Sequence, residues 1–199
     1  LPHEFIFCQM EPDGSFPNHI PNPENEAAMQ SIMDAVQESK ADLGIIFDTD
    51  VDRAGAVLSD GTELNRNRII AMMAAILLRE HPGTTIVTDS ITSTGLAAFI
   101  RKHGGVHHRF KRGYRNVINE SMRLNREGHD SQLAMETSGH GALKENYFLD
   151  DGAYLVTRLL IELARAKKEG YTLESLIADL AEPAESKEFR MNILVPDSV

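Results

Sequence analysis

The chain has 199 residues, which is enough for one large or two small domains with hydrophobic cores. Its 20 basic and 30 acidic residues give a formal net charge of −10, and because the basic residues form no continuous stripe, we expect neither nucleic acid nor a membrane as a partner. Cys8 is the only cysteine, which excludes an internal disulfide and a cysteine-based zinc site and is typical of a cytoplasmic protein.

The first segment combines a short strand pattern with a proline-rich loop. Residues 4–8 could form a strand. Prolines at positions 12, 17, 21 and 23 fix φ and keep the preceding residues extended, so residues 11–23 predict a rigid loop. Asn22 is expected to cap a helix that begins at Pro23. The buried face of this helix is indicated by apolar residues at positions 28, 29, 32, 33 and 36.

The next stretch is an apolar run that ends abruptly at three carboxylates. Residues 43–47 carry no charge and predict a buried strand, and Asp48, Asp50 and Asp52 follow its carboxyl end. Three like charges this close repel one another, and a bound cation would remove the repulsion. Their oxygens suit Mg²⁺, provided that the backbone curls so that alternate side chains converge. Arg53 could add a donor for a phosphate group.

Two alternatives to a metal loop stay open for these carboxylates. A third reading, an EF-hand, is excluded, because the sixth and twelfth positions of an EF-hand loop require Gly and Glu, and these positions hold Arg53 and Ser59 here. A phosphatase of the haloacid dehalogenase type also places Asp-x-Asp after a buried strand, with Asp48 as the nucleophile and Asp50 as the acid. The other alternative is a solvated acidic loop without a ligand. The phosphatase would also need residues for phosphate and metal, and the candidates are Thr88, Ser90, Asp150 and Asp151.

The first lobe is expected to end within a buried helix. Residues 54–58 predict a second strand. Residues 66–80, rich in Ile, Met, Ala and Leu, predict a largely buried helix that stops before Pro82. We place the first lobe at residues 1–78.

From residue 84 the pattern changes to strands that alternate with helices. Strands are predicted at 84–88, 106–110 and 131–135, with helices at 93–103 and 114–126 between them. This alternation predicts a β-α-β-α-β unit with parallel strands. Two C-terminal helices, at 151–168 and after a cap at Thr172, complete a second lobe at 79–185. Residues 186–199 read as a linker, although 188–195 could begin a strand. The fold class is α/β, with two lobes built on mixed or parallel sheets.

Parallel strands send their carboxyl ends to one edge of the sheet, so three loops should meet there. In the third loop, Glu136, Ser138 and His140 mix acceptors and donors as sugar hydroxyls require. The alternative is that they satisfy only their own backbone. In the second loop, Lys111, Arg112 and Arg115 could bind one phosphate group or could be solvated surface charge. The three loops are residues 89–90, 111–115 and 136–141.

Four stretches, in this order, resemble the α-D-phosphohexomutases, the phosphoglucomutase/phosphomannomutase family. Residues 12–23 resemble the loop that precedes the family's metal site. Asp48-Thr-Asp-Val-Asp-Arg53 resembles its Mg²⁺ loop, usually Asp-Gly-Asp-Ala-Asp-Arg. Gly113-Tyr-Arg115 resembles a short loop of the third domain, and Glu136-Thr-Ser-Gly-His140 resembles the sugar-specificity loop.

The resemblance implies a role for each of these residues. Asp48, Asp50 and Asp52 would hold Mg²⁺ as the cofactor, and Arg53 would help to position the phosphoryl group. Glu136 and Ser138 would bind sugar hydroxyls, while His140, Tyr114 and Arg115 would line the substrate cleft. The family's enzymes are isomerases of carbohydrate metabolism. They interconvert hexose 1-phosphate and hexose 6-phosphate by phosphoryl transfer, through a phosphoserine and a bisphosphate intermediate, and the metal offsets charge on the transferring group.

The departures from the family pattern define what else is expected. The phosphoserine motif Thr-x-Ser-His-Asn-Pro and the phosphate loop Arg-x-Ser-Gly-Thr-Glu are absent from the 199 residues. We therefore expect a fragment of a mutase, covering part of the second domain and the third, which is inactive alone and works with missing N-terminal and C-terminal domains on a hexose phosphate. Thr49, Tyr114 and Arg115 replace more usual residues, so the preferred sugar stays open. The dehalogenase-type phosphatase and a non-catalytic module that binds metal or sugar phosphate are the alternatives.

Overall fold

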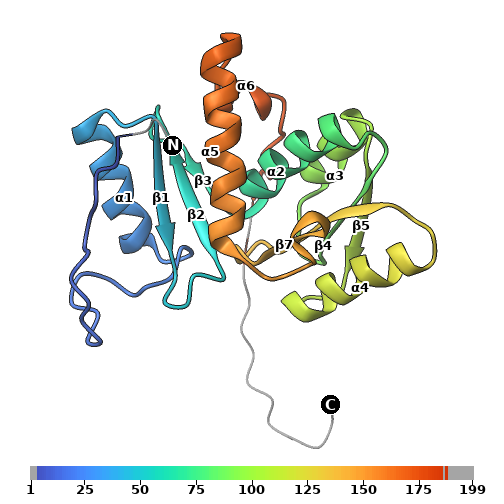
Figure 1. Ribbon diagram of the computed structural model, residues 1–199, viewed down its shortest axis with the longest axis horizontal. Coiled ribbons are helices and arrows are strands. Elements are labelled where there is room, and N and C mark those ends of the chain that lie inside the picture. Colours follow the sequence, from blue (N-terminus) through green and yellow to red (C-terminus); the bar gives the residue numbers. More distant parts are fainter. Residues whose placement is uncertain (1–3, 186, 188–199) are drawn as a thin grey trace, which may run out of the picture.

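The structure, a computed structural model, describes residues 4–185 and 187 and has an α/β fold with two sheets (Figure 1). The first sheet is antiparallel, in the order β1-β2-β3, and the second has the order β5-β4-β6-β7. In the second sheet β4 pairs in parallel with β5 and β6, whereas β7 is antiparallel to β6. The strands are β1 Leu43–Phe47, β2 Ala54–Leu58, β3 Glu63–Leu64, β4 Thr85–Asp89, β5 Val106–Phe110, β6 Ser131–Met135 and β7 Gly141–Leu143.

Helices cover the sheets and fill the space between them. Figure 1 shows α1 on the outer side of the first sheet, α5 upright in the middle of the molecule, and α2, α3 and α4 around the second sheet. The helices are α1 Glu26–Ser39, α2 Arg66–Glu80, α3 Thr94–Lys102, α4 Tyr114–Arg126, α5 Gly152–Glu169 and α6 Leu173–Leu176, with a 3-10 turn, η1, at Lys144–Asn146.

One large hydrophobic cluster joins the two sheets. It contains Leu58 of the first sheet, Ile86 and Leu133 of the second, and the buried side of α5 at Leu155 and Leu159. Helix α2 lies at its centre with nine buried residues, because its apolar side chains occupy every face. Smaller clusters place α1 against one face of the first sheet and α4 against one face of the second. The shared core therefore fixes how the two sheets lie relative to each other.

Most predicted elements are confirmed within a residue or two, including the parallel pairing of β4 with β5 and β6. The predicted strand at 4–8 is wrong, because these residues form no regular structure. The cap predicted at Asn22 is also wrong. Asn25 caps α1 by accepting from Ala28 N–H, while the Asn22 side chain accepts from Glu24 N–H and closes a turn.

The remaining difference concerns two short strands at the edges of the sheets. Strands β3 and β7 were not predicted, since runs of two and three residues are too short to show alternation. The first lobe was expected to end at residue 78, within a buried helix, and residue 78 does lie inside α2. The strand or linker expected at 188–195 falls outside the described residues.

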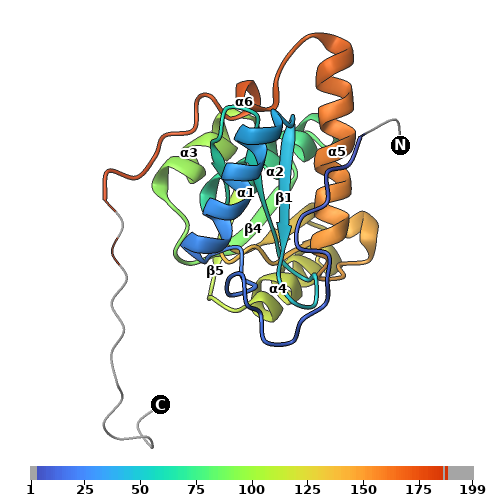
Figure 2. The same cartoon turned by 90° about the vertical axis from the view of Figure 1, so that its left-hand side faces the viewer.

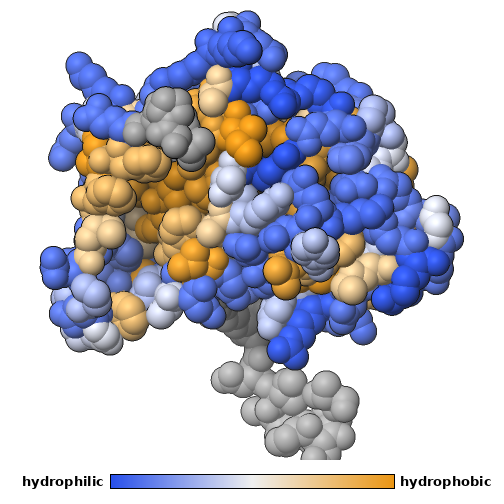
Figure 3. Space-filling view, viewed as in Figure 1, coloured by the Kyte–Doolittle hydropathy of each residue, from blue (hydrophilic) through white to orange (hydrophobic). Residues whose placement is uncertain are grey.

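The β1 side of the molecule is apolar at its surface. The described N-terminal segment runs beside β1 (Figure 2), and it exposes Phe5, Ile6, Phe7 and Met10. Figure 3 shows apolar side chains gathered on this side, while the opposite side is mostly hydrophilic. In the described part of the chain, no helix is long and apolar enough to cross a membrane.

A buried carboxylate joins α5 to α2. The Glu162 side chain is 2% exposed, accepts two hydrogen bonds from the Arg79 guanidinium, and accepts a third from the Tyr171 hydroxyl at 2.6 Å. Burial alone would raise the pKa of Glu162, but the hydrogen bonds from Arg79 and Tyr171 outweigh it, so the pKa lies below its ordinary value. A carboxylate with a lowered pKa stabilises the fold above its unfolded-state pKa, and this contribution is lost as the pH falls through the folded-state pKa.

We expect Glu162→Gln to lower the free energy of unfolding by about 2 kcal/mol at pH 7, because Arg79 then faces a neutral amide. Denaturant unfolding measures this value. The difference from the wild type should begin to shrink as the pH falls below about 4.3, the ordinary pKa of a glutamate, and should vanish only below the lowered folded-state pKa of Glu162. Glu169→Gln, at an exposed position of the same helix, should change little. A loss that does not depend on pH would contradict an ionic contribution.

Candidate functional site

The three carboxylates of the β1–β2 loop converge. A carboxylate oxygen of Asp48, one of Asp50 and one of Asp52 all lie within 4.8 Å of one another. The loop is closed at its base by two hydrogen bonds, from Asp48 N–H to the Arg53 carbonyl at 3.4 Å and from Arg53 N–H to Asp48 Oδ1 at 3.2 Å. The side chains can therefore meet although they alternate in sequence, because the backbone curls between the two strands.

Arg53 compensates the charge of the most buried member of the group. The Asp48 side chain is 1% exposed, and Arg53 Nε donates to its Oδ2 at 2.6 Å. Burial would raise the pKa of Asp48, but the hydrogen bonds from Arg53 outweigh this effect and lower it. The same guanidinium donates from Nη1 to Asn22 Oδ1 at 3.3 Å. The proline-rich loop thus helps to hold Arg53 in place.

The charge of Asp52 is compensated less completely, since Arg53 Nε lies 3.8 Å from Asp52 Oδ1, beyond hydrogen-bond distance. Its Oδ1 is buried and accepts no hydrogen bond among the described residues. Burial, together with the neighbouring carboxylate of Asp48, raises the pKa of Asp52 to about 6. A buried oxygen without a hydrogen bond, beside two other carboxylates, is a good position for a hard cation, which would supply a closer partner. The donor set therefore fits a divalent metal with oxygen ligands.

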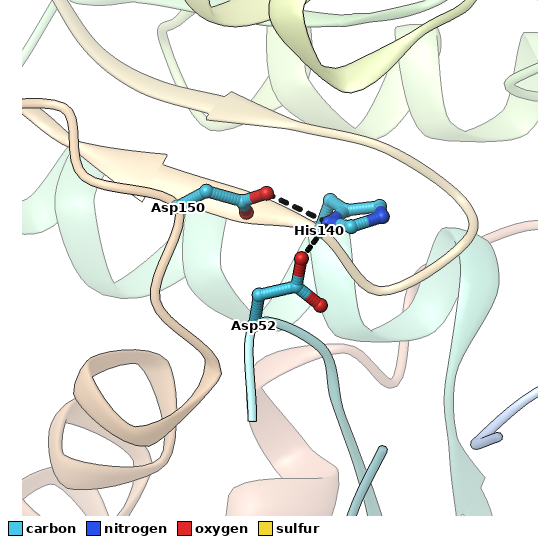
Figure 4. Close-up of side chains that lie close together, drawn as sticks. All are labelled: Asp52, His140 and Asp150. Atoms are coloured by element: carbon cyan, nitrogen blue, oxygen red, sulfur yellow. Dashed lines mark hydrogen bonds and ion pairs between the residues drawn. The ribbon is translucent and has the colours of Figure 1, made fainter. Parts of the chain in front are cut away.

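Next to this loop lies His140, between two carboxylates (Figure 4). Its Nδ1 is 2.7 Å from Asp150 Oδ2 and 3.5 Å from Asp52 Oδ2. Burial would lower the pKa of His140, but the Asp150 hydrogen bond and both negative charges outweigh this effect and raise it. Figure 4 shows the second ring nitrogen pointing away from both carboxylates, so Nε2 is left for another partner.

The segment that contains His140 is a tight turn built around Glu136. Glu136 is 4% exposed, and its carboxylate accepts from Gly113 N–H at 2.6 Å and from the Ser138 hydroxyl at 3.2 Å. Gly139 has φ +101°, and a Cβ there would lie 3.1 Å from the Ala54 carbonyl oxygen. Only glycine fits this close approach without strain. The turn therefore lies directly against the β1–β2 loop, and an isolated bridge pairs Arg53 with His140.

The loop before α4 contributes an aromatic ring. Tyr114 stacks on His140 with ring centroids 4.7 Å apart and planes inclined by 19°. Arg115 is exposed, and its Nε donates to the Tyr114 hydroxyl at 3.1 Å. The predicted metal and substrate residues thus lie in one continuous cluster: Asp48, Asp50, Asp52, Arg53, Tyr114, Arg115, Glu136, Ser138 and His140. Their binding roles stay predictions.

Two further residues of this region were not recognised as part of the site from sequence. Asp150 was considered only as a phosphatase metal ligand, but it binds His140 and also accepts from Gly141 N–H at 3.1 Å. Asp89 is fully buried at the end of β4, where it accepts from the Thr137 hydroxyl at 2.8 Å, and burial raises its pKa. Asp89 lies in one of the three loops expected to meet, but no sequence signal indicated its partner.

Comparison with known proteins gives matches over nearly the whole described chain. The model of phosphoglucomutase/phosphomannomutase alpha/beta/alpha domain II matches residues 1–61, and that of domain III matches residues 65–183.

Individual relatives agree with these matches. The phosphoglucomutase of Neisseria gonorrhoeae is 32% identical over 96% of this chain and 39% of its own length. The phosphomannomutase/phosphoglucomutase of Pseudomonas syringae pv. tomato is 34% identical over 98% of this chain and 40% of its own. A crystal structure of a family protein from Burkholderia thailandensis superposes with a TM-score of 0.72 at 33% identity, covering 85% of this chain and 35% of that one. The chain thus spans about two fifths of the curated relatives, and it belongs to the phosphoglucomutase/phosphomannomutase family.

Proposed function

We propose that this chain supplies the metal loop and the sugar loop of a Mg²⁺-dependent phosphohexomutase, which interconverts hexose 1-phosphate and hexose 6-phosphate through a phosphoserine and a bisphosphate. The proposal rests above all on one observation. Three carboxylates that converge within 4.8 Å lie directly beside the turn that carries Glu136, Ser138 and His140. The phosphoserine and the other phosphate-binding groups are expected from other domains of the enzyme.

Asp48, Asp50 and Asp52 would hold the Mg²⁺, and bound there it would offset negative charge on the transferring phosphoryl group. Arg53 is suited to help position the phosphoryl group. Its Nε and Nη1 are engaged by Asp48 and Asn22, whereas Nη2 makes no hydrogen bond within the described residues. This arrangement orients the guanidinium and leaves one end for a phosphate oxygen.

The turn at Glu136 has the chemistry that a hexose requires. Its carboxylate is prearranged by Gly113 N–H and Ser138, and an ionised carboxylate has further lone pairs for sugar hydroxyls. His140 is oriented by Asp150 through Nδ1, which leaves Nε2 to exchange a hydrogen bond or a proton with a sugar hydroxyl. Tyr114 and Arg115 would line the same cleft.

The geometry does not favour the dehalogenase-type phosphatase. Thr88 is fully buried and bonded to His107, which keeps it from phosphate. The paired acids are also occupied, since Asp150 binds His140 and Asp151 caps α5.

Asp50 offers the sharpest test of the metal site. It is exposed and accepts no hydrogen bond within the described chain, so Asp50→Asn should remove a ligand without disturbing the fold. We expect saturable Mg²⁺ binding by the wild type and an affinity weaker by about tenfold or more in Asp50→Asn. Isothermal titration or NMR shifts measure it. Asp34→Asn, at an exposed position of α1, is the matched control and should bind like the wild type. Equal, featureless titrations of all three proteins would contradict the metal site.

The sugar site is tested with glucose 1-phosphate and mannose 1-phosphate in the presence of Mg²⁺. Glu136→Gln keeps the size of the side chain but removes its charge, so we expect the affinity for these phosphates to fall by about tenfold. Glu127→Gln, at the exposed end of α4, is the control. If NMR titration shows equal affinities for the two variants, Glu136 does not bind the sugar.

A further inference from the structure

The first residue of α5 touches the metal loop through its backbone. Gly152 N–H donates to the Val51 carbonyl at 3.0 Å. The first amides of a helix have no partner within the helix, so this bond satisfies a donor that water or a side chain would otherwise have to satisfy. The cap of α5 is a separate group, because Asp151 Oδ1 accepts from Tyr154 N–H at 2.9 Å.

There is no room for a side chain at this contact. A Cβ on Gly152 would lie 2.8 Å from the Val51 carbonyl oxygen, 2.8 Å from the Arg53 carbonyl carbon and 3.0 Å from the Arg53 carbonyl oxygen. All three are backbone atoms, so no rotation of a side chain could relieve the clash. These atoms belong to the backbone of Val51 and Arg53, the residues on either side of Asp52. Any shift of this backbone therefore moves Asp52 directly.

The glycine is not explained by the helix itself. Gly152 does not adopt a left-handed backbone conformation, so alanine would fit its dihedral angles. Alanine is also the better residue within a helix, since glycine loses more conformational freedom on folding. The close approach to the metal loop is the feature that requires glycine at this position.

Val51, whose carbonyl accepts the hydrogen bond from Gly152, has a strained backbone conformation. Val51 has φ +64°, which is rare for a β-branched side chain. Its carbonyl is the one that Gly152 holds. A conformation of this kind persists only where the surroundings impose it, and such positions gather at functional sites.

We propose that Gly152 is a positioning residue for the candidate metal loop, because its N–H and its missing side chain hold Val51 and Arg53 so that Asp52 faces Asp48 and Asp50. The inference rests on the proposed metal site. It links the loop of the first sheet to the start of α5, which follows closely after Asp150, the residue that orients His140. By reciprocity, a metal that binds the ordered loop must also strengthen the contact with Gly152.

The test compares Gly152→Ala with Gly95→Ala by Mg²⁺ titration. Gly95 also lies in the first turn of a helix, where a Cβ would meet the Ala181 backbone, so it controls for a general packing defect. We expect Mg²⁺ affinity to fall by about tenfold or more in Gly152→Ala and to stay within about twofold of the wild type in Gly95→Ala. Circular dichroism confirms that each variant is folded.

Wild-type affinity in a folded Gly152→Ala protein would overturn the inference and leave the metal site intact. Failure of the wild type itself to bind Mg²⁺ would remove the proposed metal site and, with it, the inference.

A second measurement serves if Gly152→Ala does not fold. Amide hydrogen exchange of Gly152 in the wild type should slow by about tenfold when Mg²⁺ saturates the loop, since the metal and the contact stabilise each other. The Leu96 amide, held by the cap Ser93 of α3, is the internal control and should not change. An exchange rate at Gly152 that does not respond to bound Mg²⁺ would overturn the inference.

Discussion

Mutual repulsion of three carboxylates at the tip of one hairpin is the constraint around which this structure is built. Oxygens of Asp48, Asp50 and Asp52 lie within 4.8 Å, although like charges at that distance disfavour one another. The protein compensates part of the charge with the Arg53 guanidinium and part with His140. Within the described residues it leaves Asp52 Oδ1 buried without a hydrogen bond, and burial raises the pKa of Asp52. We regard this incomplete compensation as the reason to propose a cation.

The two sheets supply different halves of the arrangement, and neither would be enough alone. The first contributes the carboxylate loop between β1 and β2, and the second contributes the turn before β7 and the loop before α4. Three contacts join them: the bridge between Arg53 and His140, the ion pair between His140 and Asp52, and the bond from Gly152 to Val51. Behind these contacts, α2 and α5 bury one continuous core between the sheets. A rigid core is what allows loops from separate sheets to hold side chains at defined distances.

Most of the correctly predicted elements were found from local sequence patterns. The apolar run at β1, the helix spacing of α5 and the cap at Thr172 depend on neighbouring residues alone, so they can be predicted without knowing the fold. The convergence of three loops at one edge also followed from topology, and the bonds joining Glu136 to Gly113 and Asp89 to Thr137 bear it out. The cap at Asn25 was missed because Asn22 and Pro23 form an equally good local signal. Asp150 and Gly152 could not be assigned, since their partners lie in other elements and only the packed fold brings them together.

Anomalous scattering from Mn²⁺ bound to crystals of this chain tests the central claim most directly, because it locates the ion without assuming its ligands. Mn²⁺ takes oxygen ligands as Mg²⁺ does. The account predicts one strong peak within about 2.5 Å of oxygens from Asp48, Asp50 and Asp52. The absence of a peak at this loop, or a peak only at the group formed by His140 and Asp150, would contradict it.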